Sequence, residues 1–364
     1  GKFKTSFPAI QVKPGVEYFL NFYASLKNED GLLKAGTKLA DAQVSLPFYQ
    51  PFVAEVQSSP VIADDAASLL TLTAGNLSVG FDKETGALIS YKEGSTELIK
   101  EALRPNFWRP VTDNDMGNGM NKTLRPWRDA GRQAKLLSMK QKALGKEVYE
   151  VVSHYKLPVG ESDFIVTYHF SGKGYLDVNC TFIPGNDTLP LLPRMGVSIT
   201  LNRQFSQMEW LGRGPHENYI DRNTSSYVGL YKGSVADQYF PYDRPQENGN
   251  KTEVRWMSLT DTAGQGLMVV GQPYVSTSAY LFPTEDLDEP GLRKSQRHLS
   301  DIQFKDMVTW NIDLKQMGVG GDTSWGAYPH QPYLIPAERM SFSFRFCPAK
   351  QNGVSGNRQY LNFK

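Results

Sequence analysis

Three segments in the middle of the chain read as β-strands, and very little sequence separates them. The segments are residues 148–157, 164–170 and 175–183. The stretches between them carry Pro158, Gly160, Gly172 and Gly174. These are typical turn residues, because proline fixes one backbone dihedral angle and glycine adopts conformations closed to other residues. The pattern therefore predicts an antiparallel meander, in which each strand pairs with the next.

The rest of the chain follows the same pattern. A hairpin is predicted over residues 70–91, with a turn at 82–86 that begins with Asp and ends with Gly. Further strand patterns occur at residues 196–201, 253–259, 266–270 and 340–346. We predict one helix, a short one around residues 125–135 with Pro126 near its first turn. The sequence therefore predicts an all-β fold of many antiparallel strands joined by long loops.

The sequence divides into four parts. Residues 12–47 contain only two or three strand patterns, which cannot close a β-sandwich by themselves. We therefore interpret residues 1–52 as the C-terminal part of such a sandwich. Residues 53–68 include Ser58-Ser59-Pro60 and read as a linker. One large β domain is predicted for residues 69–350, followed by a tail at 351–364.

Composition supports a large folded domain and argues against two classes of partner. Of the 364 residues, 40% are hydrophobic and 12% aromatic, which is enough for a sizeable core. A net charge of +1 gives no basic surface for nucleic acid or for an anionic membrane. No apolar run is long enough to span a bilayer. We therefore expect neither nucleic acid nor a membrane as a partner, and the compartment stays open between cytoplasm and periplasm.

The residues that usually hold metals or cofactors do not form a recognisable pattern. Cys180 and Cys347 lie in separate strand-like runs without metal-ligand spacing. We expect them to be buried free thiols, with a disulfide as the alternative in an oxidising compartment. The five histidines are scattered, and neither a phosphate-binding loop nor a dinucleotide fingerprint occurs. No cofactor is expected in this chain.

Residues 317–327 form the loop most informative about function, and they read Met-Gly-Val-Gly-Gly-Asp-Thr-Ser-Trp-Gly-Ala. The glycines allow the backbone to approach a neighbour closely. Trp325 stands between Ser324 and Gly326, which are too small to screen its indole. We expect Asp322 to hydrogen-bond its own backbone and so to lock the loop. An aromatic ring held on a rigid loop suits the apolar face of a sugar; the alternative is that Trp325 fills a core.

A second polar stretch, residues 104–119, combines arginines and aromatics with Asp113-Asn114-Asp115. On a strand, the two aspartates would share a face and suit a metal or acid–base chemistry. On a loop, they would instead bond backbone amides and shape turns. Gly117 and Gly119 indicate a loop that can move.

Residues 210–222 form the densest polar cluster. His216 and Glu217 are adjacent, so on a strand they would point to opposite faces and could not act on one atom. We therefore interpret Glu217, Asp221 and Arg222 as a buried ion network that fixes the loop.

Two further charged segments read as structural. Residues 237–249 are rich in aromatics and prolines and are typical of a packed connection between strands. Within it, we expect Glu247 to pair with Arg255. His298 follows several basic residues and reads as part of a solvated turn.

Together, these motifs resemble the C-terminal part of a glycoside hydrolase family 2 β-galactosidase, namely the end of its large chain plus the small-chain-type domain. The resemblance spans about residues 69–346 and follows the family's order. Five runs carry it: R-P-V-T-D-N-D-M-G at 109–117, W-L-G-R-G-P-H-E-N-Y-I-D-R at 210–222, P-Y-D-R-P-Q-E-N-G at 241–249, T-W-N-I-D-L at 309–314 and M-G-V-G-G-D-T-S-W at 317–325.

The resemblance implies a fold and an activity. The implied fold is a large antiparallel β-supersandwich of the galactose-mutarotase type, preceded at residues 1–52 by part of an immunoglobulin-like β-sandwich. In the family, two catalytic glutamates hydrolyse terminal β-D-galactose residues with retention. They lie on a (β/α)₈ barrel, which also binds Mg²⁺ and Na⁺ and is absent from this sequence. Because no carboxylate pair here stands out as acid/base and nucleophile, the chain alone is expected to be inactive.

The resemblance also implies roles for three residues. Trp325 aligns with a tryptophan that stacks on the substrate, chiefly on the aglycone side. Gly117 lies where the family has a mobile active-site loop, although the sequence departs from the family pattern at residues 118–121. Asp322 would support the tryptophan loop, and no catalytic role transfers to Glu217. The implied partners are a β-galactoside sugar, the remainder of the parent polypeptide and, in the whole enzyme, further copies in a homo-oligomer.

Two other functions remain open at this point. A stand-alone aldose mutarotase or epimerase would need a histidine acid and a glutamate base at one anomeric carbon, for which His216 and Glu247 are the candidates. A carbohydrate-binding module would need measurable sugar affinity without any barrel. A single indole rarely suffices for that.

Overall fold

The computed structural model describes residues 9–52, 57–288, 297–323, 325–349 and 360. The chain divides into two compact units, Gly1–Glu55 and Val56–Lys364. The tail predicted at 351–364 lies outside the described residues except for Tyr360, whose side chain is buried.

The first unit contains one two-stranded antiparallel sheet. Its strands are β1 (Tyr18–Ser25) and β2 (Lys38–Leu46). Several hydrophobic side chains stay exposed on both strands, including Phe22 and Val44. Two strands bury too little apolar surface to form a core. The interpretation that this unit is the end of an immunoglobulin-like sandwich stays a prediction.

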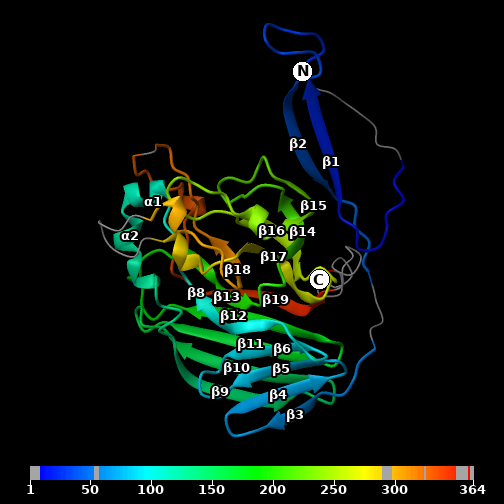
Figure 1. Ribbon diagram of the computed structural model, residues 1–364, viewed down its shortest axis with the longest axis vertical. Helices are drawn as coiled ribbons and strands as arrows, with labels where there is room; N and C mark the ends of the chain where they lie inside the picture. The colour runs from blue at the N-terminus through cyan, green and yellow to red at the C-terminus, as the bar shows by residue number, and fades with distance from the viewer. Residues whose placement is uncertain (1–8, 53–56, 289–296, 324, 350–359, 361–364) are drawn as a thin grey trace. The chain divides into compact units, whose positions relative to one another are not determined.

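The second unit is built on two antiparallel sheets (Figure 1). Within the described residues, the larger sheet has twelve strands: β8 (Ile99–Asn106), β9 (Lys135–Ala143), β10 (Val148–Lys156), β11 (Asp163–Ser171), β12 (Tyr175–Ile183), β13 (Arg194–Leu201), β14 (Gln207–Gly214), β15 (Tyr227–Ser234), β16 (Lys251–Thr260), β17 (Gly266–Tyr280), β18 (Val308–Gln316) and β19 (Met340–Ala349). The smaller sheet has five: β3 (Ile62–Asp65), β4 (Leu69–Ala74), β5 (Leu77–Asp82), β6 (Leu88–Glu93) and β7 (Thr96–Glu97).

Strand order confirms the all-β antiparallel fold. The main path of the large sheet runs β15-β14-β16-β17-β19-β12-β11-β10-β9. The predicted meander is its last part, where β10 pairs with β11 and β11 with β12, residue for residue. β17 changes partner along its length, pairing with β19 over residues 266–272 and with β18 over residues 276–280. β18 in turn pairs with β13, and β13 with β8, so the sheet branches at β17.

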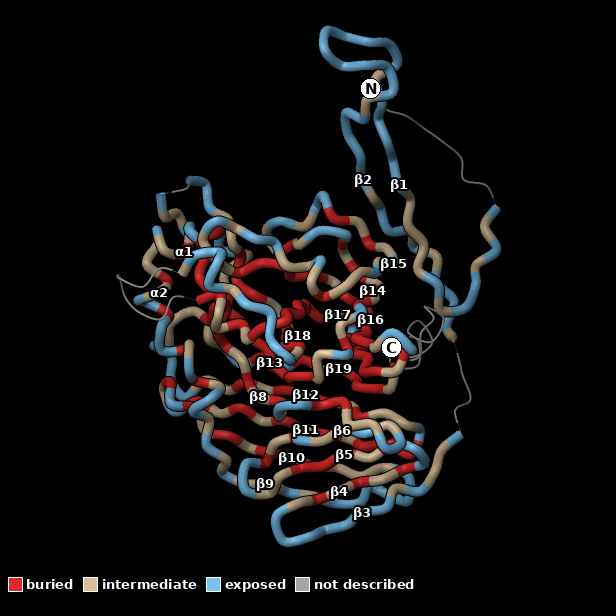
Figure 2. Tube along the Cα trace, viewed as in Figure 1, coloured by how far each residue is buried: buried red, intermediate tan, exposed pale blue. Residues whose placement is uncertain are grey.

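The core lies between the small sheet and the curled large sheet, and buried segments follow this layer (Figure 2). β4 and β11 alternate buried and half-buried residues, as expected for strands with one face on a core. Across the layer, the rings of Phe81 and Tyr168 meet edge to face at 4.9 Å. Such aromatic contacts add to the burial of apolar surface that stabilises the sandwich.

Helical structure is short, and of the helix predicted around residues 125–135 only a 3₁₀ turn at Arg125–Trp127 forms, with Pro126 in its first turn as predicted. The helices are α1 (Asp113–Asn118), α2 (Met120–Thr123) and the 3₁₀ turns η1 (Arg125–Trp127), η2 (Ala236–Gln238), η3 (Thr284–Leu287), η4 (Leu299–Asp301) and η5 (Gln331–Tyr333). α1 begins at a capping box in which Thr112 and Asp115 bond each other's backbone N–H groups. The Thr-x-x-Asp spacing is the sequence signal for the start of this helix, and it was not used in the prediction. Residues 62–65, within the predicted linker, form β3.

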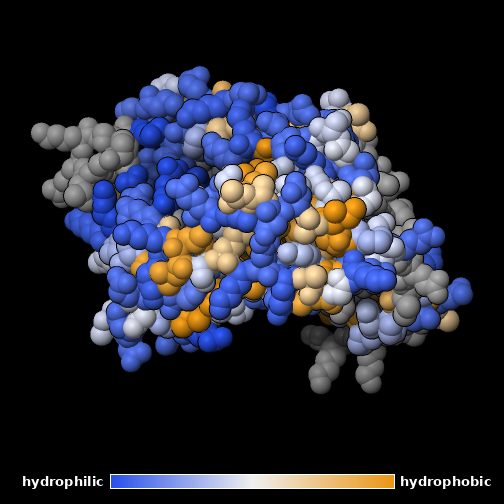
Figure 3. Space-filling view, turned by 90° about the horizontal axis from the view of Figure 1, so that it is seen from below, coloured by the Kyte–Doolittle hydropathy of each residue, from blue (hydrophilic) through white to orange (hydrophobic). Residues whose placement is uncertain are grey.

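Three further features concern the surface, the cysteines and the length of the helices. The face seen from below is mostly hydrophilic and carries several hydrophobic patches (Figure 3). Cys180 and Cys347 are buried and free, and burial raises the pKa of both thiols, that of Cys347 to about 12. Among the described residues, no helix is both long enough and apolar enough to cross a membrane.

Candidate functional site

Trp325 lies on the loop that follows β18, and the residue is 90% exposed. The other five tryptophans of the chain are all buried. A fully exposed indole has a high cost in unburied apolar surface. The reading in which Trp325 fills a core is therefore wrong, and its ring is free to contact a ligand or another protein part.

The backbone of residues 318–320, early in the tryptophan loop, is held by three hydrogen bonds from other parts of the chain. Gly320 donates its N–H to Asp221 Oδ2 at 2.7 Å. The carbonyl of Gly318 accepts from Arg109 at 3.1 Å, and that of Val319 accepts from Asn114 at 3.2 Å. Since these partners come from the stretches 104–119 and 210–222, the structure brings together three of the segments singled out in the sequence.

Glycine is required where the tryptophan loop meets α1. Gly326 has a φ of +106°, and a Cβ built on it would lie 2.4 Å from the backbone of Gly117. A Cβ on Gly117 would lie 2.9 Å from Cα of Gly326. The two backbones therefore pack directly on each other. Gly117 lies in the last turn of α1; the mobility predicted for it stays a prediction.

The bond predicted from Asp322 to its own backbone stays a prediction, and the structure shows another contact of this side chain. Its carboxylate lies 2.8 Å from His330 Nε2, on the far side of the same loop. Both side chains are exposed, so water screens the pair. Within the loop, the Trp325 N–H donates to Thr323 Oγ1 at 3.3 Å. Asp322 thus contacts the segment that follows the tryptophan loop.

The two aspartates of residues 104–119 serve the loop structure. Asp115 forms a buried two-bond ion pair with Arg109, at 2.5 and 3.1 Å. Asp113 pairs with Arg244 from the loop 237–249. Each carboxylate is therefore held by an arginine, and neither acts with the other on a shared atom.

The ion network predicted for Glu217, Asp221 and Arg222 is confirmed only for Glu217 and Arg222, because Asp221 accepts from the Gly320 N–H instead. Glu217 pairs with Arg222 at 2.6 Å and accepts hydrogen bonds from Tyr242 Oη and the Gly249 N–H. Arg222 itself stays half-exposed, so the network is only partly buried. His216 Nε2 lies 3.0 Å from Ser226 Oγ and is not held by Glu217.

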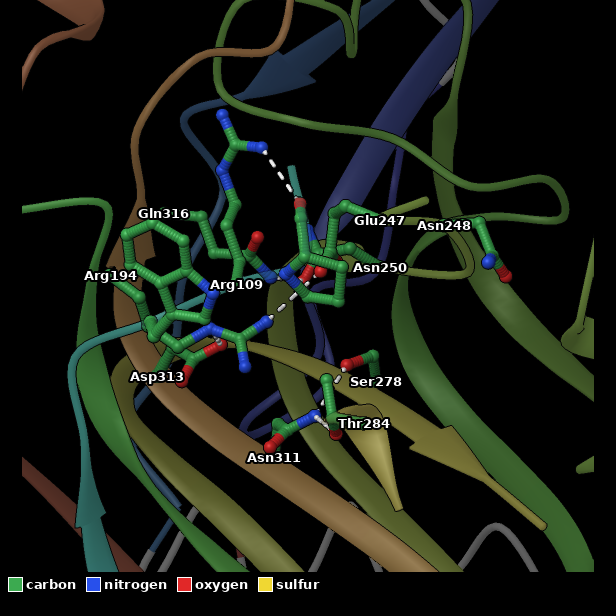
Figure 4. A network of polar contacts seen from close by, with 12 residues as sticks. Arg109, Arg194, Glu247, Asn248, Asn250, Ser278, Thr284, Asn311, Asp313 and Gln316 are labelled. Atoms are coloured by element: carbon green, nitrogen blue, oxygen red, sulfur yellow. Dashed lines mark hydrogen bonds and ion pairs between the residues drawn. The ribbon is translucent and has the colours of Figure 1, made fainter. Parts of the chain in front are cut away.

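The predicted pair between Glu247 and Arg255 is wrong. Arg194 lies between two buried carboxylates, 3.4 Å from Glu247 Oε2 and 3.4 Å from Asp313 Oδ2 (Figure 4). Arg255 stacks instead on Tyr274, 4.1 Å from the ring centroid. The fold places Arg194 next to Glu247, although the two residues are 53 positions apart in the chain. The spacing of charged residues in the sequence could not indicate this partner.

Burial shifts the ionisation of both carboxylates in this network. It raises the pKa of Asp313 to about 7, against the opposing effect of Arg194, and Glu247 adds to the rise. Burial also raises the pKa of Glu247, with Arg194 and Arg109 opposing. A carboxylic acid that titrates near neutral pH in a buried site is unusual. The sequence signal that could have revealed it is a charged residue within an otherwise largely apolar strand, as Asp313 is in β18, where it is buried.

A pocket with a volume of about 260 Å³ opens beside this network. Its wall comes from α1 and from the loops 210–222, 237–249 and 317–325, so it joins four of the motif-bearing segments. Trp325 is not part of the wall. Nowhere in the described ranges do three or more His, Cys, Asp or Glu residues form a group suited to a metal ion.

The family model and the related sequences agree on one family. The family model described as "Beta galactosidase small chain" matches residues 73–346. A beta-galactosidase from Priestia megaterium is 36% identical over 89% of this chain and 31% of its own length. One from Lactobacillus delbrueckii subsp. bulgaricus is 32% identical over 93% of this chain and 32% of its own. The chain thus spans about a third of these relatives.

Among solved structures, a galactose 1-epimerase from Lactobacillus acidophilus aligns with 82% of this chain and 100% of its own, at a TM-score of 0.45 and 8% identity. A putative aldose 1-epimerase from Escherichia coli aligns with 78% of this chain and 99% of its own, at a TM-score of 0.43 and 11% identity. Neither similarity indicates a function for this chain.

Proposed function

Because the chain belongs to the beta galactosidase small chain family, we propose that it is the sugar-facing, non-catalytic part of a β-galactosidase. In this proposal, the rest of the polypeptide carries the catalytic carboxylates and hydrolyses terminal β-D-galactose residues with retention. That part also holds the Mg²⁺ and Na⁺ and contributes to a homo-oligomer. The present chain completes the pocket by presenting Trp325 to the substrate, chiefly on the aglycone side.

The observation that carries this proposal is the exposure of Trp325, a residue that is 90% exposed. Hydrogen bonds to Gly318, Val319 and Gly320 hold an earlier part of the same loop. An exposed aromatic ring on such a loop is suited to contact with the apolar face of a sugar.

The carboxylates of the chain support a non-catalytic role. Glu217 accepts bonds from Arg222, Tyr242 and Gly249, and Asp113 is bound by Arg244. Retaining hydrolysis needs one carboxyl as nucleophile and a second, about 5 Å away, as acid and base. Groups already engaged in structural ion pairs are poorly suited to either task. The His216–Glu247 pairing that an epimerase would require also lacks support, because these two side chains bond to Ser226 and Arg194.

The test is Trp325→Ala in the whole β-galactosidase that contains this chain, with Trp325→Phe as the graded control. An aromatic stacking contact contributes about 1 kcal/mol. We therefore expect roughly a fivefold loss of affinity for an aryl galactoside in the alanine variant, and a smaller loss in the phenylalanine variant. Unchanged KM and kcat in the alanine variant would refute the stacking role.

A second assay tests the non-catalytic role. The 364-residue chain, incubated with nitrophenyl β-D-galactoside, should release no nitrophenol above buffer. When the remainder of the parent polypeptide is added and the two parts assemble, nitrophenol should be released. Hydrolysis by the chain alone would contradict the proposal directly.

A further inference from the structure

The large sheet carries a second hydrophobic cluster on the face opposite the main core. In the paired strands β16, β17 and β19, the side chains of Met257, Val269 and Phe346 point into the main core. Side chains alternate along a strand, so the residues next to these three point to the outer face. Residues of that face, together with one residue from beyond β19, form a cluster that we call the outer cluster: Trp256, Met268, Val270, Cys347, Ala349 and Tyr360.

The outer cluster is as well buried as the main core. Trp256, Met268 and Val270 are each at most 1% exposed, and Cys347 is fully buried. The face of an antiparallel sheet that does not pack on the core is commonly open to water and polar. Burial on this face therefore requires another part of the chain to lie over the strands.

Tyr360 provides such a cover. Among the described members of the outer cluster, it alone lies outside β16, β17 and β19, and it is 3% exposed. A tyrosine ring buries a large apolar area, so this one side chain closes an appreciable part of the cluster. Tyr360 belongs to no described strand. It can therefore leave the sheet without breaking a described strand pairing.

The margin of the outer cluster is held by the sheet itself. Tyr175 and Tyr274 are partly buried and pack against the cluster. Arg345 stacks on Tyr175 at 3.4 Å from the ring centroid, and Arg255 stacks on Tyr274 at 4.1 Å. All four residues belong to strands of the large sheet. These contacts should stay in place when the cover moves away.

We propose that Tyr360 is a releasable cover of the outer cluster, so that this cluster opens when the residue leaves while the main core stays closed. The two clusters lie on opposite faces of one sheet, and local opening of one face does not require global unfolding. Release of Tyr360 turns the outer face into an apolar surface and brings Cys347 into contact with solvent. The inference does not depend on the function proposed above.

The two cysteines report on the two clusters separately. Cys347 belongs to the outer cluster, whereas Cys180 belongs to the main core. Both thiols are free and buried. A thiol reagent reaches a buried cysteine only in a form in which its surroundings have opened. The rate of modification of each cysteine therefore measures the opening of its own cluster.

The test measures modification of the folded 364-residue chain by N-ethylmaleimide, with the modified cysteine identified by mass spectrometry. Tyr360→Ala removes the covering ring, Tyr360→Leu removes part of its apolar area, and Tyr360→Phe keeps the ring. Loss of a buried aromatic side chain should increase the modification rate of Cys347 about ten- to hundredfold in Tyr360→Ala. The increase should be smaller in Tyr360→Leu and absent in Tyr360→Phe. Cys180 should stay unreactive in all three variants.

Three results would overturn the proposal. An unchanged rate at Cys347 in both Tyr360→Ala and Tyr360→Leu would show that this residue does not cover the cluster. Equal acceleration at Cys347 and Cys180 would show that the variants unfold globally. Equal acceleration of Cys347 modification in Tyr360→Phe and Tyr360→Ala would show that the ring is not the part that closes the cluster.

Discussion

Asp221 accepts a hydrogen bond at 2.7 Å from the backbone N–H of Gly320, a residue 99 positions later in the chain. The same carboxylate explains why residue 318 is glycine, since a Cβ there would lie 2.7 Å from Asp221 Oδ2. One aspartate therefore sets the path of the backbone that leads to Trp325. The tryptophan loop is positioned by a distant segment as well as by its own sequence.

The first prediction concerns this bond. Asp221→Ala removes the acceptor and should destabilise the loop by about 1–3 kcal/mol, because the Gly320 N–H loses a charged partner. Amide hydrogen exchange at Gly320 should become faster by a corresponding factor. Asp322→Ala is the control, since its partner His330 is exposed and Gly320 is not involved. Unchanged exchange at Gly320 in Asp221→Ala would mean that the bond does not hold the loop.

The second prediction separates backbone strain from backbone contact. Gly119 and Gly326 both have positive φ, +79° and +106°, but only Gly326 lies against another backbone. Alanine at Gly119 meets nothing within 4 Å, so its cost is strain alone. Gly326→Ala must also push α1 away. In the whole enzyme it should therefore impair sugar binding, whereas Gly119→Ala should not. Equal kinetics for the two variants would contradict a functional contact between α1 and the loop.

The third prediction concerns the buried pair of Arg109 and Asp115. Asp115→Ala leaves Arg109 charged in a fully buried site, which typically costs about 3–5 kcal/mol of unfolding free energy. Lys142→Ala breaks an ion pair with Glu150 at the surface and should cost no more than about 1 kcal/mol. Urea denaturation of both variants gives the comparison. Similar losses of unfolding free energy in the two variants would show that burial does not determine how strongly an ion pair stabilises the fold.

The fourth prediction is a pH effect from Asp313, whose pKa rises from 3.8 to about 7 in the fold. Between about pH 4 and pH 7 the native state therefore binds more protons at this site than the unfolded state, so this residue makes stability fall as pH rises. Asp313→Asn cannot ionise and should lose that slope, while Arg194 keeps Glu247 as a partner. The free energy of unfolding of the variant, relative to the original protein, should increase from pH 4 to pH 7. A constant difference would refute the shift.

The fifth prediction concerns the thiols. Cys180 and Cys347 are buried, and burial raises their pKa, so little reactive thiolate forms at neutral pH. Both should react with a thiol reagent only after the protein is unfolded. Rapid modification of either residue in the folded chain would contradict their placement in the core.

The spacing of apolar and turn residues was sufficient to predict the fold class. It was not sufficient to predict which residues form the candidate site. The strands around residues 148–183 were predictable because turn residues bound them closely. The helix at Asp113–Asn118 was missed because its signal is a cap at Thr112 and not an apolar face. In a helix this short, capping outweighs periodicity.

Charged partners were the hardest part to predict. The pairing of Glu217 with Arg222 is local and follows from the sequence. Arg194 reaches Glu247 only because β13 and the loop 237–249 meet in space, 53 positions apart. Such contacts depend on strand order, which a single sequence does not determine. The exposure of Trp325, in contrast, agrees with the small residues beside it.

The branch at β17 makes the second unit sensitive to the length of that strand. Residues 266–272 pair with one neighbour and residues 276–280 with another. Deleting one residue between these two stretches would invert the inward and outward sides of one stretch relative to the other, because side chains alternate along a strand. Either the part of the sheet next to β19 or the part next to β18 would then turn its core side chains outward. Natural variation in chain length should therefore be confined to the loops and excluded from this strand.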